Sequence, residues 1–118
     1  GIHWMIDRDG STRASVPESH VAHHVLTHSH RSIAIELIND GDGRDAFAPA
    51  QIDALVALLR DIARRHPAIT RAAVKRHSDL DRGHLPCAPE RRRKVDPGAA
   101  YPHQTVLDRV FGADAPAR

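Results

Sequence analysis

The chain has 118 residues, of which 41% are hydrophobic and 27% are charged. These values are ordinary for a folded globular protein and argue against disorder, so we expect one domain with a hydrophobic core. The single cysteine, Cys87, excludes an internal disulfide. No apolar run approaches the length of a membrane span, so we expect none.

The formal net charge of +2 leaves out ten histidines, several of which would be partly protonated in mild acid. The run Arg91-Arg92-Arg93-Lys94 could contact nucleic acid or an anionic cell-wall polymer. We favour a solvated loop, because the chain has no basic helix, stacking aromatics or zinc-finger spacing. A nucleic-acid partner is therefore not expected.

The first third of the chain predicts a strand at residues 2–6, a turn at Asp9-Gly10 and a second extended segment ending at Val16. Residues 17–31 are expected to form a loop that holds five histidines. Residues 32–39 give the clearest strand pattern, with apolar side chains on both faces. This pattern predicts a central strand covered on both sides, which would place the carboxylate of Glu36 among buried neighbours.

The clearest helix is predicted over residues 49–65, with Pro49 in the first turn and apolar residues at helical spacing. Val74 is expected in a brief strand that delivers His77 to its end. Residues 86–93 are expected to form an irregular loop, and residues 102–111 a short helix ended by Gly112. Strands mixed with helices in this order predict an α/β fold, a mixed central sheet with helices on both faces.

Two motifs in the second half carry the chemistry. His77-Ser-Asp-Leu is followed by Lys94-Val-Asp96-Pro-Gly, which together offer an imidazole, an ammonium and a carboxylate. Imidazole and carboxylate are ordinary Zn²⁺ ligands, and a lysine can stabilise negative charge on a substrate oxygen. Pro97 favours extended backbone at Asp96, so Lys94 and Asp96 are predicted to face one cavity. The alternative for Lys94 is a salt bridge to Asp96.

These motifs resemble the C-terminal signature of the type 2, zinc-dependent N-acetylmuramoyl-L-alanine amidases, a family related to phage lysozyme-amidases and peptidoglycan recognition proteins. Residues 1–10 resemble the strand and turn of that family, and residues 32–37 its central strand. Residues 22–25 resemble its Ala-Trp-His-Ala segment more weakly, with His23 in the place of Trp. The resemblance runs from Gly1 to about Leu107, with the motifs in the family's order.

The resemblance implies hydrolysis of the amide between N-acetylmuramic acid and L-alanine, in peptidoglycan or in muropeptides. His77 and Asp96 would be zinc ligands, and Glu36 would activate the zinc-bound water. A salt-bridged structural role is the alternative for Glu36. Lys94 would polarise the scissile carbonyl or hold its oxyanion. The substrate groove would be lined by three further residues, His24, His3 and Trp4.

In the family, one further zinc histidine lies on a strand upstream of the segment that matches Gly1. We therefore expect residues 1–118 to be an amidase-like domain that is truncated at its N-terminus. A substitute ligand, with His3 and His24 as the nearest candidates, or a lost activity would also explain the difference. The alternative function is a peptidoglycan-binding module without turnover. By resemblance, the bacterial cell envelope is the favoured compartment, with the cytoplasm as the alternative.

Overall fold

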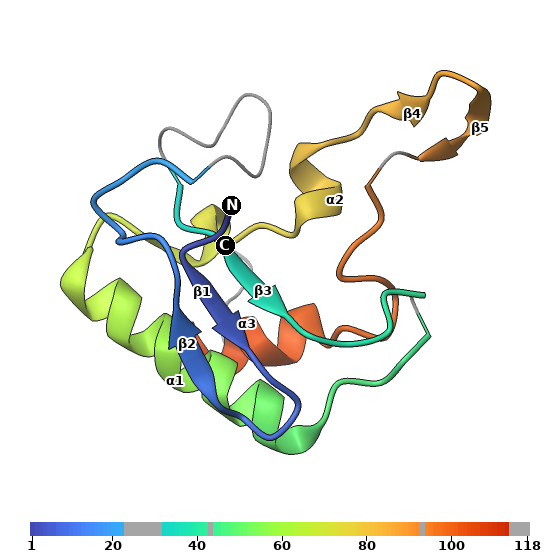
Figure 1. Cartoon of the computed structure of the whole chain (residues 1–118). Coiled ribbons are helices and arrows are strands. Elements are labelled where there is room, and N and C mark those ends of the chain that lie inside the picture. The colour runs from blue at the N-terminus through green and yellow to red at the C-terminus, as the bar shows by residue number, and fades with distance from the viewer. Residues whose placement is uncertain (23–31, 43, 93, 114–118) are drawn as a thin grey trace.

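A computed structural model describes residues 1–22, 32–42, 44–92 and 94–113 (Figure 1). Its main sheet has three strands in the order β2–β1–β3. Strand β1 (Trp4–Ile6) pairs antiparallel with β2 (Thr12–Ala14) and parallel with β3 (Ile35–Leu37), so the sheet is mixed. In the described part of the chain β3 has a partner on one side only, so it is an edge strand there, whereas the sequence predicted a central strand.

The turn between β1 and β2 depends on Gly10. Its φ of +90° lies in the region that glycine adopts without steric cost. A Cβ at this position would lie 2.9 Å from the carbonyl oxygen of Ala50, so the close approach of the turn to the following helix also requires glycine. The predicted turn at Asp9-Gly10 is therefore confirmed, and it contacts the helix that supports the sheet.

Helix α1 (Pro49–Arg65) has the predicted bounds, with Pro49 in its first turn. Its buried face includes Ile52, Leu55 and Val56, which cluster with Ile6 of β1 in the core. Gln51 is fully buried, and its Nε2 donates to the carbonyl oxygens of Ile6 and Ile38 at 2.9 Å each. A single side chain thus joins the helix to β1 and to the residue after β3. Among the described residues, no helix is long and apolar enough to cross a membrane.

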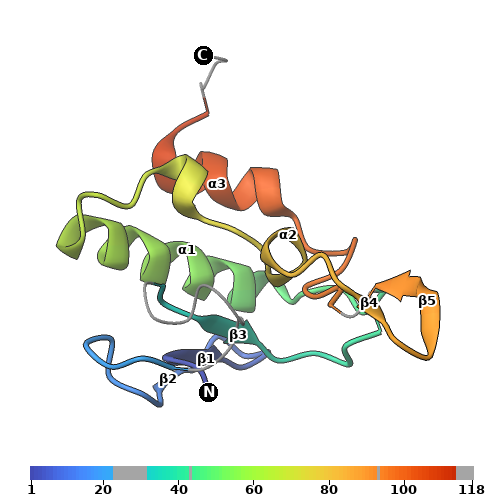
Figure 2. The ribbon, with the colours of Figure 1, turned by 90° about the horizontal axis from the view of Figure 1, so that it is seen from above.

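Helix α3 (His103–Phe111) packs on α1 rather than on the open face of the sheet. Val106 is fully buried in the same core cluster as Val56, and the Arg60 guanidinium donates to the Arg109 carbonyl oxygen. Figure 2 shows α1 and α3 on the same side of the sheet. The predicted α/β class with a mixed sheet is confirmed, but in the described part the two longer helices share one face because α3 is stacked on α1.

The segment between α1 and α3 is built from small elements: a 3₁₀ helix (Arg71–Ala73), helix α2 (His77–Leu80) and a hairpin of β4 (His84–Leu85) and β5 (Ala88–Arg92). The predicted strand at Val74 is wrong, because the chain there leaves a 3₁₀ turn and enters α2. The predicted irregular loop is also wrong. Leu85 pairs with Ala88 across a two-residue turn that begins at Pro86, whose fixed φ suits that position.

Candidate active site

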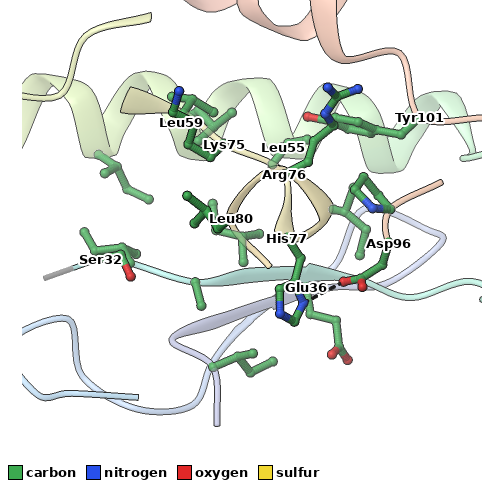
Figure 3. A pocket seen from close by; sticks show the side chains of 18 of the residues that line it. Ser32, Glu36, Leu55, Leu59, Lys75, Arg76, His77, Leu80, Asp96 and Tyr101 are labelled. Atoms are coloured by element: carbon green, nitrogen blue, oxygen red, sulfur yellow. Dashed lines mark hydrogen bonds and ion pairs between the residues drawn. The ribbon is translucent and has the colours of Figure 1, made fainter. Parts of the chain in front are cut away.

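A cavity of about 1000 Å³ lies between β3 and the segment that leads into α2. One side is formed by residues 32–39 and the other by residues 73–77 and 95–98. Leu55, Leu59 and Ile62 of α1 contribute apolar lining, and Figure 3 shows the first two of these above β3. The cavity thus follows the edge of the sheet that has no strand partner in the described part of the chain.

The two predicted metal ligands meet at this cavity. His77 Nδ1 lies 3.1 Å from Asp96 Oδ2, and Figure 3 draws this contact as a dashed line. The backbone also joins the two segments, because Ser78 N–H donates to the Asp96 carbonyl oxygen at 3.1 Å. The His77 side chain is 21% exposed, while that of Asp96 is 62% exposed. The fold thus brings together an imidazole and a carboxylate that are 19 residues apart in the sequence.

The second ring nitrogen of His77, Nε2, has an unusual environment. Nε2 is buried and has no hydrogen-bond partner in the described part of the chain. A buried polar atom normally has a partner, since leaving it unpaired costs about 1–3 kcal/mol. An imidazole with one nitrogen on a carboxylate and the other free is able to bind a metal or a substrate group. His77 therefore has one ring nitrogen that no described group of the protein uses.

Helix α2 is held in place by Arg76 and Asp79. The Asp79 carboxylate accepts hydrogen bonds from the Arg76 guanidinium at 2.9 Å through each oxygen, and from the Arg76 backbone N–H at 3.0 Å. The Arg76 guanidinium lowers the pKa of Asp79 to about 2, with a further contribution from the backbone hydrogen bond. This paired charge fixes the single turn of helix that presents His77.

Glu36 lines the same cavity, and Figure 3 shows its side chain in the part of the cavity where His77 and Asp96 lie. It is exposed, so the prediction that this carboxylate is buried is wrong. The reason is long-range: Ile35 and Leu37 pack on the core beside α1, so Glu36 points to the opposite face of the sheet, where neither α1 nor α3 packs. The location in the cavity suits a base that acts on a bound water or substrate.

Lys94 is exposed and is not among the residues that line the cavity, although Asp96 is. The structure does not bring these two side chains to one surface as the extended spacing predicted. Neither the alternative, a salt bridge to Asp96, nor another ion pair of Lys94 is found within the described residues.

His3 and Trp4 also lie outside the cavity lining and have partners in the framework. His3 is 1% exposed; its Nδ1 accepts from Ala34 N–H at 2.9 Å, and its Nε2 is 2.8 Å from the His20 carbonyl oxygen. Trp4 Nε1 donates to Glu18 at 2.7 Å. Their positions are those of structural residues, whereas His24, the other predicted groove residue, lies outside the described residues.

Sequence reasoning missed an aromatic group at one end of the cavity. Tyr101 packs edge-on against Phe47 with ring centroids 5.8 Å apart, and it lies 5.6 Å from the ring of His103. All three line the cavity. Burial raises the pKa of Tyr101 to about 12 and lowers the pKa of His103, so both are neutral near pH 7. No motif marks these residues, because they come together only when α3 packs on α1.

The described residues contain no group of three or more His, Cys, Asp or Glu side chains placed to hold one metal ion. The donor set here is the pair His77 and Asp96. An imidazole and a carboxylate fit zinc in kind, and their side chains lie together here. A catalytic zinc normally takes three protein ligands, so one ligand must come from elsewhere for the site to be complete.

The comparison with protein families decides the membership of this chain. The family model described as N-acetylmuramoyl-L-alanine amidase matches residues 1–99, which contain the cavity's His77, Asp96 and Glu36. The chain belongs to the N-acetylmuramoyl-L-alanine amidase family. The fold and the resemblance predicted from the sequence are thereby confirmed at the level of the family.

Individual members of the amidase family are also similar to this chain in sequence. The N-acetylmuramoyl-L-alanine amidase AmiD of Escherichia coli is 35% identical over 113 residues, which cover 83% of this chain but 37% of that protein. This chain therefore spans little more than a third of the length of that curated relative. What the whole relative does is not thereby shown for this part.

Solved structures of amidases match the fold. The N-acetylmuramoyl-L-alanine amidase LysC of Clostridium intestinale has a TM-score of 0.74 at 25% identity, over 90% of this chain and 61% of that one. AmiD of E. coli in complex with the substrate anhydro-N-acetylmuramic acid-L-Ala-D-γ-Glu-L-Lys has a TM-score of 0.74 at 28% identity, over 95% of this chain and 48% of that one.

Proposed function

We propose that this chain is the catalytic part of an amidase that cleaves the bond between N-acetylmuramic acid and L-alanine in peptidoglycan or muropeptides. The observation that carries the proposal is the His77–Asp96 pair in a cavity that also holds Glu36. Family membership and the substrate complex of a relative support it. The comparisons do not favour the non-catalytic alternative, since the relatives named above are amidases.

We propose Zn²⁺ as the cofactor, with His77 and Asp96 as two of its ligands. When bound, zinc lowers the pKa of a water molecule and polarises a carbonyl group. The 3.1 Å contact between His77 Nδ1 and Asp96 Oδ2 brings an imidazole and a carboxylate to one place, which supports their use as two ligands of one ion.

For the third ligand we propose a residue outside the described part of the chain. Two sources are open: residues 23–31, which contain four histidines, and chain that would precede Gly1. The cavity along the outer edge of β3 supports the second source. It is bounded by strand-like backbone at residues 74 and 76 on its far side, and its α1 lining is apolar. A strand in this cavity would satisfy the free edge and approach His77.

Glu36 is proposed as the general base. Its carboxylate takes a proton from the attacking water and delivers it to the amine of L-alanine as the amide bond breaks. Lys94 is exposed and its side chain is long and flexible, so we propose that it moves to the carbonyl oxygen when substrate binds. His24 remains a proposed groove residue. His3 and Trp4 are left out of the proposal because of their contacts in the framework.

The test is cleavage of N-acetylmuramoyl-L-Ala-D-γ-Glu-L-Lys in the presence of Zn²⁺, followed by mass spectrometry of the products. We expect release of the intact tripeptide with a free alanine amine, and a loss of about 10²–10⁴-fold in kcat for Glu36→Gln. The matched control is Glu90→Gln, which makes the same change at an exposed residue of β5. Cleavage at another bond, or full activity of Glu36→Gln, would contradict the proposal.

A further inference from the structure

A second cleft, of about 520 Å³, adjoins the active-site cavity beside α2. Three residues, Arg76, Val95 and Gly98, line both hollows, so the two are neighbours that share a wall. The remaining lining of the second cleft comes from α2, from Arg82 between α2 and β4, from β5 and from the segment after Asp96. No residue of the proposed reaction lines it, which makes it a separate site.

The charge of this cleft is strongly positive. Its lining contains three guanidinium groups, those of Arg76, Arg82 and Arg92, and one carboxylate, that of Asp79. The Asp79 carboxylate is paired through both oxygens with Arg76. Arg82 and Arg92 therefore have no compensating negative charge in the lining. Two uncompensated guanidinium groups in a cleft favour an anionic ligand.

Arg92 adds a donor that is fixed in orientation. Its terminal NH2 nitrogen donates to the carbonyl oxygens of Ser78 and Asp81, which ties β5 to the end of α2. Its Nε is buried and has no hydrogen-bond partner in the described part of the chain. A buried, unpaired N–H of a charged group is costly, and an anion bound in the cleft beside this guanidinium would offset part of that cost.

Arg82 supplies a second cation with its full charge available. It is exposed, and within the described residues it forms no hydrogen bond or ion pair. Guanidinium groups bind carboxylates with charge-assisted hydrogen bonds, and often through two parallel bonds. A cleft with one free guanidinium and one fixed guanidinium N–H thus fits a carboxylate.

We propose that this cleft binds a carboxylate of the peptide part of the substrate, an inference that rests on the proposed amidase function. The substrate named in the E. coli complex contains L-Ala-D-γ-Glu-L-Lys. A γ-linked glutamate keeps a free α-carboxylate, and the C-terminal lysine has another. Both follow the alanine at the scissile bond, so peptide leaving the active-site cavity next to Arg76 would place a carboxylate in the adjoining cleft.

The experiment is calorimetric titration of the tripeptide L-Ala-D-γ-Glu-L-Lys into the wild-type chain, Arg82→Gln and Arg91→Gln. Arg91 is the matched control, because it is an exposed arginine of the same hairpin that does not line the cleft. We expect Kd to rise about fivefold to tenfold in Arg82→Gln and to stay within about twofold in Arg91→Gln. Equal effects of the two substitutions would overturn the proposal, since they would report general charge alone.

Two further arms identify the group that is bound. Tripeptides amidated at the glutamate α-carboxyl or at the C-terminus are titrated into wild type and Arg82→Gln. For one of the two amidated peptides, we expect a higher Kd with the wild type than the unmodified tripeptide has. For that peptide, Arg82→Gln should not raise Kd any further. The proposal would be overturned if Arg82→Gln still raised Kd for both amidated peptides. It would also be overturned if low-millimolar acetate displaced the peptide. Because titration requires no turnover, Arg82-dependent binding without cleavage would reject only the catalytic function.

Discussion

The framework of the molecule and its site region are held together by different means. In the framework, which comprises the main sheet with α1 and α3, Ile6, Val56 and Val106 are almost completely buried in one core. In the site region, residues 71–98, the elements are short and no described hydrophobic side chain belongs to the buried core. Polar contacts position His77 and Asp96 there instead. The site can therefore loosen or change without unfolding the sheet.

Among the described residues, each region has one carboxylate whose pKa is lowered to about 2, so these two carboxylates can be compared directly. In the framework, Arg65 lowers the pKa of Glu18, helped by hydrogen bonds from Trp4 and His66. In the site region, Arg76 lowers the pKa of Asp79. Glu18 joins the loop after β2 to the end of α1, so it closes a long stretch of chain. Asp79 joins neighbouring residues within one turn.

The larger effect is expected for Glu18→Gln. We expect a loss of about 2 kcal/mol in the free energy of unfolding at pH 7, because the Glu18 side chain is 14% exposed and its charge is paired. A lowered pKa stabilises the fold above the unfolded value and loses this contribution as pH falls. The wild type should therefore lose stability from about pH 5 to pH 2, and the variant should lose less.

Denaturant unfolding at pH 7 and pH 3 measures this difference. Glu90→Gln, an exposed residue of β5, is the matched control and should change the free energy of unfolding by less than about 0.5 kcal/mol. Equal stability of Glu18→Gln and Glu90→Gln at both pH values would show that the framework does not depend on this ion pair.

A smaller and local effect is expected for Asp79→Asn. The Asp79 side chain is 28% exposed, so solvent screening reduces its contribution to about 1 kcal/mol. Loss of the Arg76 contact should open α2, and amide hydrogen exchange at Ser78 and Asp81 should accelerate about fivefold. Exchange at Val56 in α1 should not change. If Val56 accelerates equally, the two regions unfold as one unit and the comparison fails.

The same division explains what the sequence predicted. Helix α1 was predicted with correct bounds, because its apolar spacing and Pro49 are local signals. The pairing of His77 with Asp96 was anticipated because both belong to recognisable motifs. The exposure of Glu36 was not, because it depends on which face of the sheet α1 and α3 cover. The burial of His3 was missed because it too depends on a distant part of the chain: its partner Ala34 is 31 residues away. The hairpin was missed because its strands are too short to show alternation.

The most direct test of the account is the zinc affinity of the chain at pH 7, measured by competition with a chelator for the wild type and three variants. We expect His77→Ala and Asp96→Ala to weaken zinc binding at least about tenfold. The control His84→Ala removes an exposed histidine of β4 and should leave the affinity unchanged. Zinc binding that is the same in all four proteins, or absent from the folded wild type, would contradict the assignment of His77 and Asp96 as the metal site of this chain.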